Sequence, residues 1–279
     1  MNFGSKIVFV VALVCYFILM AGLIGFGVSY AYKPYDLTSA ELVAINAHRL
    51  KNKTERPYVR LGEGIILDPA TTIIYQAFDK RYGDKIGYLS SRKNQFWAKQ
   101  NGYAYKLFVP ETKEDEMPHF LRYRVFLELA RDPRNKNIVY IDGDAVVNKH
   151  HKYLMSNDTD VTFGNEVSGK FGKLYHNAKH KYYVFNTGYM CFKNNDFTIE
   201  LAREILTGKK CKDCRKHGCG IWNFKDQGCL DKLIEQKSRK YLDDHFSILN
   251  VQSRNKNTKK LVIHAAGIHN NEIRRKMLG

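Results

Sequence analysis

An apolar run that ends in two aspartates stands near the middle of the sequence, NIVYIDGDAVV at residues 137–147. The part NIVYI is apolar almost throughout, as in a strand that is buried on both faces of a sheet. Asp142 and Asp144 follow it with only Gly143 between them, so both carboxylates face one point if the chain stays extended. Carboxylates held together without a partner repel each other. The segment therefore needs either a tight turn or a cation.

Three interpretations fit these residues. Asp-Gly between two apolar runs is a strong signal for a β-hairpin. The string DGDAV also matches haloacid-dehalogenase-like phosphatases, in which the first aspartate, here Asp142, is the nucleophile. In the third interpretation, the two carboxylates bind Mg²⁺ or Mn²⁺, which prefer oxygen ligands and also accept phosphate oxygens.

Strands and helices alternate before the aspartates. TTIIYQAF (71–78) and YAYKLFV (103–109) have the β-branched and aromatic composition of strands. A helix is predicted between them, capped by Ser90 or Ser91 and ended at Asn101-Gly102. A second helix is predicted over PHFLRYRVFLELARDP, ending before Pro133. This order predicts an α/β fold with a largely parallel sheet, in which ligands bind beyond the carboxyl ends of the strands.

Three later segments place polar groups where apolar runs break or end. Asn186-Thr187-Gly188 interrupts YYVFNTGYMCFKN (182–194), where the glycine predicts a bulge or bend in a strand. Asp226 and Gln227 stand at the start of a predicted helix, where capping is the simplest role. His264 ends the strand-like run KLVIH, although a single histidine is more often structural than a ligand.

Taken in order, SSRKNQFWAKQNGYAY, NIVYIDGDAVV, FNTGYMCFKN, KDQ and VIHAAG resemble retaining glycosyltransferases of the glycosyltransferase-A fold. The likeness runs over about residues 70–270 and is greatest to the family of fungal galactosyl- and mannosyltransferases and plant xyloglucan xylosyltransferases. The glycogenin and galactinol synthase family has a similar motif order. The resemblance implies a single α/β domain, a Rossmann-like nucleotide-diphospho-sugar transferase. The motif order argues against the phosphatase.

The resemblance also implies an activity, the metal-dependent transfer of a hexose or pentose from a nucleoside diphosphate sugar to a glycan or glycoconjugate acceptor, with retention of configuration. Mn²⁺ (or Mg²⁺) would bind Asp142, Asp144 and His264 and act as a Lewis acid on the leaving diphosphate. Asp226 and Gln227 match the Asp-Gln pair beside the donor sugar. The implied donor-binding residues are Asn94, Asp142, Gly143, Asp144, Asn186, Thr187, Gly188 and His269.

The chain departs from the family pattern after the histidine. Ala265 and Ala266 stand where relatives have a bulky residue. The basic residue that usually meets the diphosphate has three candidates here, which are His269, Arg274 and Arg275.

The N-terminal part predicts a membrane anchor. Residues 7–32 contain no charged side chain, and a membrane-spanning helix needs about 20 apolar residues. A cleaved signal peptide, with Ala21-Gly22 as the small residues at the cleavage site, is the alternative. We predict a cytosolic tail (1–6), a transmembrane signal-anchor (7–32), a stem (33–66) and a catalytic domain (67–279). The predicted location is the Golgi or ER membrane, as a single-pass type II protein with a luminal domain.

Cysteines and sequons agree with a luminal domain. Four cysteines lie close together and predict either two disulfides or a zinc site, namely Cys211, Cys214, Cys219 and Cys229. A luminal setting favours disulfides, whereas zinc would favour a non-catalytic, membrane-anchored binding module. Asn52 and Asn157 begin glycosylation sequons, which predicts a glycoprotein.

The formal net charge of +17 invites a nucleic-acid interpretation. The basic residues are spread along the chain, however, and the sequence contains no recognisable nucleic-acid module. We therefore expect no nucleic-acid partner. The charge fits either a basic surface around a phosphorylated substrate or a solubilising surface.

Overall fold

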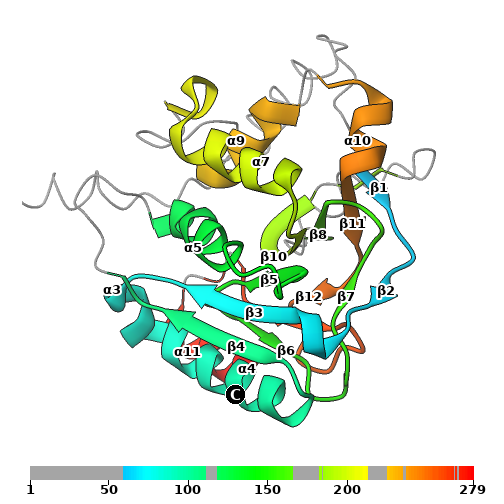
Figure 1. Cartoon of the computed structure of the whole chain (residues 1–279). Coiled ribbons are helices and arrows are strands. Elements are labelled where there is room, and N and C mark those ends of the chain that lie inside the picture. Colours follow the sequence, from blue (N-terminus) through cyan, green and yellow to red (C-terminus); the bar gives the residue numbers. More distant parts are fainter. Residues whose placement is uncertain are drawn as a thin grey trace, which may run out of the picture. The chain divides into compact units, whose positions relative to one another are not determined.

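Eight strands form one mixed sheet in the order β4-β3-β5-β10-β8-β11-β1-β9 (Figure 1). The structure is a computed structural model that describes residues 59–110, 118–165, 182–183, 185–212, 225–234, 237–266, 268 and 270–279. β3 (Thr72–Ala77) pairs in parallel with β4 (Ala104–Phe108) and with β5 (Asn137–Ile141). These strands confirm the sequence prediction for this half of the sheet.

The other half of the sheet corrects the expectation of a largely parallel sheet. β10 (Phe185–Lys193) runs antiparallel to both of its neighbours, β5 and β8 (Val161–Asn165). β11 (Phe246–Leu249) is parallel to β8 and to β1 (Val59–Leu61), and β9 (Tyr182–Tyr183) is antiparallel to β1. The alternation that predicted a parallel sheet stops at β5, because residues 142–165 contain strands and turns but no helix.

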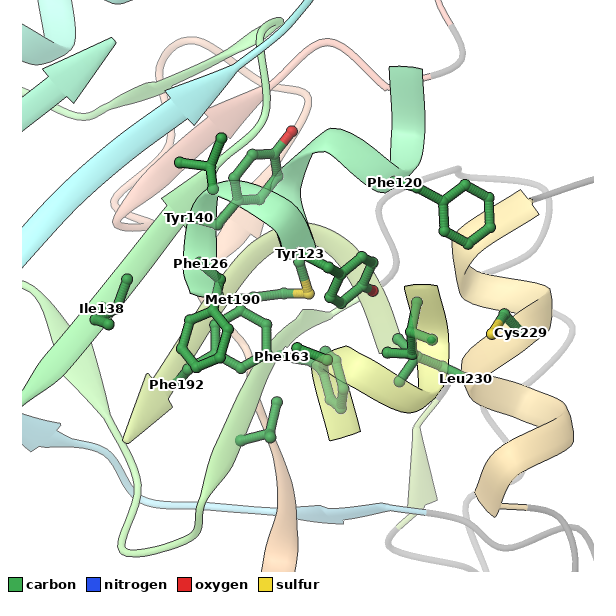
Figure 2. Close-up of a cluster of buried hydrophobic side chains, with 14 of the residues drawn as sticks. Phe120, Tyr123, Phe126, Ile138, Tyr140, Phe163, Met190, Phe192, Cys229 and Leu230 are labelled. Atoms are coloured by element: carbon green, nitrogen blue, oxygen red, sulfur yellow. The ribbon is translucent and has the colours of Figure 1, made fainter. Parts of the chain in front are cut away.

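Helices cover both faces of the sheet (Figure 1). Alternate residues of β5 point to opposite sides: Ile138 and Tyr140 pack with α5 (Leu121–Leu129), whereas Val139 and Ile141 pack with α4 (Tyr88–Gln100). Figure 2 shows the first of these cores, which also includes α7 (Asp196–Thr207) and α9 (Lys225–Ile234). Burial on both faces is the reason why NIVYI is apolar throughout.

The helix before β4 begins earlier than the sequence predicts. α3 (Lys80–Tyr82), the π-helical turn η2 (Gly83–Gly87) and α4 follow one another without a break. Asp79 caps the start, because its side chain accepts a hydrogen bond of 2.7 Å from the backbone N–H of Tyr82. The cap predicted at Ser90 or Ser91 is therefore wrong. The predicted end is confirmed, since Gly102 follows α4 with a positive φ of 78°.

A three-stranded sheet lies beside the main one, in the order β12-β13-β6. β6 (Ala145–Val147) follows the two aspartates and pairs antiparallel with β13 (Val262–His264), not with β5. The hairpin predicted for Asp142-Gly143 is therefore wrong, because the strands on its two sides belong to different sheets. β12 (Gln252–Ser253) completes this sheet in parallel with β13.

The remaining elements are a two-stranded sheet and short helical segments. β2 (Ile65–Ile66) pairs antiparallel with β7 (Met155–Ser156). The other helical segments are η1 (Pro69–Thr71), η3 (Pro118–Phe120), η4 (Lys209–Cys211), α10 (Arg239–His245) and α11 (Asn271–Leu278). The glycine-containing strand β10 shifts register between Asn186 and Met190, as the predicted bulge requires.

The N-terminal side of the domain needs one correction. β1 and β2 fall within residues 33–66, which the sequence assigned to a stem, yet β1 pairs inside the main sheet. The described residues belong to a unit that spans Arg56–Gly279. Within them, no helix is both long enough and apolar enough to cross a membrane. The predicted tail, anchor and most of the stem lie outside the described residues.

Candidate active site

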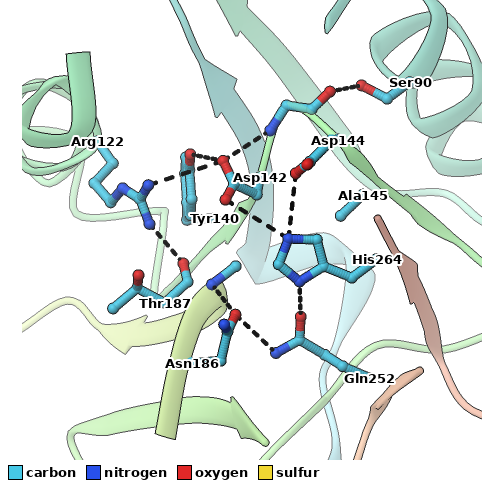
Figure 3. Close-up of polar contacts among 12 residues, drawn as sticks. Ser90, Arg122, Tyr140, Asp142, Asp144, Ala145, Asn186, Thr187, Gln252 and His264 are labelled. Atoms are coloured by element: carbon cyan, nitrogen blue, oxygen red, sulfur yellow. Dashed lines mark hydrogen bonds and ion pairs between the residues drawn. The ribbon is translucent and has the colours of Figure 1, made fainter. Parts of the chain in front are cut away.

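Asp142, Asp144 and His264 come together where three strands end or begin (Figure 3). Asp142 follows β5, Asp144 precedes β6, and His264 is the last residue of β13, paired with Ala145. One ligand atom from each residue lies within 4.8 Å of the others. Nε2 of His264 lies 3.2 Å from Oδ1 of Asp144 and 3.7 Å from Oδ2 of Asp142. The structure therefore brings together the three residues for which the resemblance implied a metal.

The two carboxylates have different surroundings. Asp142 keeps 30% of its side chain exposed, and its Oδ1 accepts hydrogen bonds from the Tyr140 hydroxyl (2.9 Å) and the Gly143 N–H (3.0 Å). Asp144 is buried, with Oδ2 at 3.5 Å from Nη2 of Arg274. Burial disfavours its charge, but the hydrogen bond and charge of His264 and the charge of Arg274 together lower the pKa of Asp144. Asp144 is therefore held as a carboxylate.

The backbone between the aspartates is held by side chains from α4 and β3. Ser90 donates a hydrogen bond of 2.6 Å to the carbonyl oxygen of Gly143, and Gln76 Nε2 donates one of 2.8 Å to that of Asp142. A Cβ at Gly143 would lie 2.7 Å from Cε1 of Tyr82, too close for a side chain. Glycine is thus required by the aromatic packing behind the loop.

Gln252 determines which nitrogen of His264 carries a proton. Its Oε1 lies 2.7 Å from Nδ1 of His264, and its Nε2 donates to the carbonyl oxygen of Asn165 (3.2 Å) and to Oδ1 of Asn186 (3.4 Å). The amide oxygen therefore accepts from Nδ1–H, so Nε2 is the ring nitrogen that can present a lone pair to a cation beside the aspartates. Two carboxylates and one imidazole nitrogen are donors that fit Mn²⁺ or Mg²⁺.

The segment Asn186-Thr187-Gly188 lies against the same site. The carbonyl oxygen of Gly188 accepts a hydrogen bond of 2.9 Å from the N–H of Asp142, and Oδ1 of Asn186 accepts one of 2.7 Å from the N–H of Gly188. A Cβ at Gly188 would collide with the ring of His264. The bulge in β10 therefore leaves room for the histidine.

Asp226 and Gln227 lie in the first turn of α9, as the sequence predicts, and both side chains are buried. Oδ2 of Asp226 lies 3.4 Å from Nη1 of Arg122 and 3.5 Å from the Tyr123 hydroxyl. Nε2 of Gln227 donates to the carbonyl oxygen of Phe185 at 2.6 Å. The pair is connected to the aspartate cluster through Arg122.

Arg122 is a site residue that the sequence interpretation missed. It is buried, donates to the carbonyl oxygen of Thr187 at 2.7 Å, and lies 3.8 Å from Oδ1 of Asp142. Burial disfavours its charge, but the carboxylates of Asp226 and Asp142 raise the pKa of Arg122 above its usual value. A signal was present, because Arg122 occupies the helical stripe of Phe126 and Leu129, where a charged residue needs a buried partner.

Asn94, which the resemblance implied as a nucleotide-binding residue, supports the backbone after Asp144. It is fully buried under β6, where it donates to the carbonyl oxygen of Ala145 (2.9 Å) and accepts from the N–H of Val147 (2.8 Å). These bonds make Asn94 a support for the strand after Asp144, and its contact with the nucleotide stays a prediction.

Two further predictions concern residues near the site. His269 lies outside the described residues, whereas Arg274 on α11 contacts Asp144. Cys211 and Cys229 form a disulfide that joins η4 to α9, so these two cysteines are not zinc ligands. Cys214 and Cys219 lie outside the described residues.

Comparisons with known proteins identify the fold. No protein-family model matches the sequence, and no curated protein matches it. Among solved structures, the chain is similar to a glycosyltransferase involved in the glycosylation of the major capsid of PBCV-1, with a TM-score of 0.50 and 14% identity over 75% of this chain and 98% of that chain. This likeness and the mixed α/β sheet agree with the predicted glycosyltransferase-A fold.

Two other solved structures are similar to the chain with lower TM-scores. The bifunctional glycosyltransferase WbbM has a TM-score of 0.41 and 13% sequence identity, over 79% of this chain and 51% of that chain. A mutant of Drosophila β1,4-galactosyltransferase 7, in complex with manganese, UDP-Gal and xylobiose, gives 0.42 at 14% identity, over 73% of this chain and 72% of that chain. The fold assignment rests on the PBCV-1 enzyme.

Proposed function

We propose that this chain is a metal-dependent glycosyltransferase. It transfers a hexose or pentose from a nucleoside diphosphate sugar to a glycan or glycoconjugate acceptor, with retention of configuration. The observation that carries the proposal is the convergence of Asp142, Asp144 and the Nε2 atom of His264 within 4.8 Å, on the fold of a glycosyltransferase. Mn²⁺ or Mg²⁺ bound there would act as a Lewis acid on the diphosphate of the donor.

Basic groups beside this cluster suit a diphosphate. Arg274 lies 3.5 Å from Asp144 and can turn from that carboxylate to phosphate oxygens, because its planar fork binds either group. The diphosphate oxygens also accept the proton of the acceptor hydroxyl in a retaining transfer from the leaving-group face. The work of the protein is then to position donor and acceptor and to stabilise charge.

The donor sugar is proposed to lie between the bulge of β10 and the start of α9. Asp226 faces Arg122, which also holds the carbonyl oxygen of Thr187. A carboxylate at this place stabilises the positive charge that develops on the sugar ring in an oxocarbenium-like transition state. Gln227, held by the carbonyl oxygen of Phe185, lies next to Asp226 in the first turn of α9.

The location is a separate proposal. We propose that residues 7–32 anchor the chain in the Golgi or ER membrane with the domain in the lumen, where the Cys211–Cys229 disulfide is stable. Of the two sequons, Asn157 is buried and its Oδ1 accepts from the N–H of Gly64 at 3.0 Å. Glycosylation is therefore expected at Asn52 alone, and a mass shift with peptide N-glycosidase that Asn52→Gln removes would support it.

The activity is tested by incubating the full chain and Mn²⁺ with UDP-galactose, UDP-glucose, UDP-xylose and GDP-mannose. The expected result is release of nucleoside diphosphate from one donor, and a product whose anomeric configuration by NMR equals that of the donor. An inverted product would remove the retaining mechanism. Absence of turnover with every donor, together with hydrolysis of p-nitrophenyl phosphate, would favour the phosphatase with Asp142 as nucleophile.

A further inference from the structure

Gln252 lies behind the metal-ligating histidine and is buried, with 2% of its surface exposed. It stands on β12, in parallel with β13, which carries His264. Its side chain reaches three other strands. Oε1 meets His264 and Nε2 meets Asn186 in β10 (Figure 3). Nε2 also meets Asn165 at the end of β8. No role for this residue follows from the proposed activity itself.

The orientation of the Gln252 amide is fixed by its partners. Nε2 faces two acceptor oxygens, the Asn165 carbonyl and Oδ1 of Asn186, so a rotation of the amide by half a turn would oppose oxygen to oxygen. The backbone N–H of Gln252 also donates to Oδ1 of Asn165 at 2.9 Å. A buried polar group that loses its hydrogen-bond partner is destabilising. The orientation with Oε1 toward His264 is therefore strongly preferred.

Strand β8 is shaped to admit this amide. A Cβ at Gly164 would collide with the side-chain nitrogen of Gln252. Gly164 lies opposite Asn186 in the β8–β10 pairing, so the glycine opens the sheet surface where the amide passes between the two strands. A larger residue at this place would displace Gln252 from His264.

The consequence concerns the other side of the imidazole. Because Oε1 of Gln252 accepts from Nδ1–H, a neutral His264 has its lone pair on Nε2, at 3.2 Å from Asp144. The lone pair of Nε2 and the carboxylate oxygens repel each other. This arrangement is therefore favourable only when a positive charge lies between the nitrogen and the oxygens. In metal sites, the histidine nitrogen that does not bind the metal commonly donates a hydrogen bond to a neighbouring group. This hydrogen bond fixes the tautomer of the ring and raises the basicity of the ligating nitrogen.

We infer that Gln252 is a positioning residue that holds His264 in the Nδ1–H tautomer, so that Nε2 can bind a divalent cation together with Asp142 and Asp144. Through Asn186, the same amide connects this cation site to the segment Asn186–Gly188. The inference rests on the proposed function for the identity of the site, but it concerns binding of the cation alone.

The test uses Mn²⁺ as the only ligand and the full chain. Gln252→Leu removes the acceptor, whereas Gln252→Glu in its protonated form keeps an oxygen toward Nδ1 and a hydroxyl donor toward Asn165. We expect Gln252→Leu to weaken Mn²⁺ binding by about 10- to 100-fold in calorimetry, and Gln252→Glu to restore most of the affinity. Circular dichroism and thermal unfolding of each variant confirm that it is folded before it is titrated.

A second readout does not depend on any ligand. Nitrogen-15 NMR of the histidine side chains distinguishes Nδ1–H from Nε2–H tautomers, and the signal of His264 is the one missing in His264→Asn. We expect Nδ1 to carry a proton in the metal-free wild-type chain, and Gln252→Leu to lose this preference because Nδ1–H no longer has its acceptor. An unprotonated Nδ1 in the wild type, or unchanged Mn²⁺ affinity in folded Gln252→Leu, would overturn the inference. Failure of donor turnover with both expected results intact would remove only the proposed activity.

Discussion

Asp144 is buried and is nevertheless held as a negatively charged carboxylate. Its partners are Nε2 of His264 and the Arg274 guanidinium, and together they lower the pKa of its carboxyl group despite burial. We predict that Asp144→Asn reduces donor turnover at least about a hundredfold, because a bound metal supplies several kcal/mol of charge stabilisation. The measurement is the rate of nucleoside diphosphate release at saturating Mn²⁺.

The matched control for this variant is Asp132→Asn, which changes an exposed aspartate whose partner is Arg134. It should retain wild-type turnover, since surface ion pairs contribute little. Wild-type turnover in Asp144→Asn would show that this carboxylate does not bind the cation.

Single residues differed in how well the sequence predicted them. Asp142 and His264 could be predicted because each is the first polar residue at the end of an apolar strand, and Asp144 because it stands two residues after Asp142. Gln252 could not, since its partners come from β8, β10 and β13, and no local pattern relates them. Asn94 was identified, but its surroundings depend on the contact between α4 and β6, which the sequence did not show.

At the scale of elements, one buried arginine side chain on α5 connects β5 to α9. Arg122 on α5 meets Asp142 after β5 and Asp226 on α9. We predict that Arg122→Met lowers the free energy of unfolding by about 3–5 kcal/mol, because the buried carboxylate of Asp226 loses the positive charge that compensates its burial. Chemical denaturation measures this difference.

The control is Arg131→Met, an exposed arginine just beyond the end of α5. Arg122→Lys is informative as well. It retains the charge, but it loses the planar fork that reaches Asp226 and the Thr187 carbonyl at once, so an intermediate loss is expected. Equal stability of Arg122→Met and Arg131→Met would contradict the role of Arg122 in linking these elements.

The elements themselves were predicted where burial controls the sequence pattern. NIVYI is buried on both faces and could be identified as a strand, and Gly102 marked a helix end correctly. The start of the first helix was missed, because η2 contains Gly83 and Gly87, which resemble a loop in sequence. Tertiary packing explains the glycine at position 87, since a Cβ at Gly87 would lie 2.7 Å from the ring of Phe78.

At the scale of the described domain, the Cys211–Cys229 disulfide fastens the helix that carries Asp226. It closes a segment with a sequence separation of 18 between η4 and α9, and both cysteines are buried. We predict that replacing both with alanine destabilises the protein by about 2–4 kcal/mol, since the cross-link restricts the unfolded chain. Denaturation of the double variant, and of the wild type with reductant, measures the effect. A wild-type midpoint that is unchanged by full reduction would contradict it.

The central claim is that Asp142, Asp144 and His264 bind a divalent cation that in turn holds a nucleoside diphosphate. The most direct measurement is calorimetric titration of UDP and of GDP into the full chain, in Mn²⁺ and again in excess EDTA. We predict that one of the two nucleotides binds in Mn²⁺ and that its binding is lost both in EDTA and in Asp142→Asn. Equal nucleotide affinity with and without the metal, or no binding of either nucleotide in Mn²⁺, would contradict the claim.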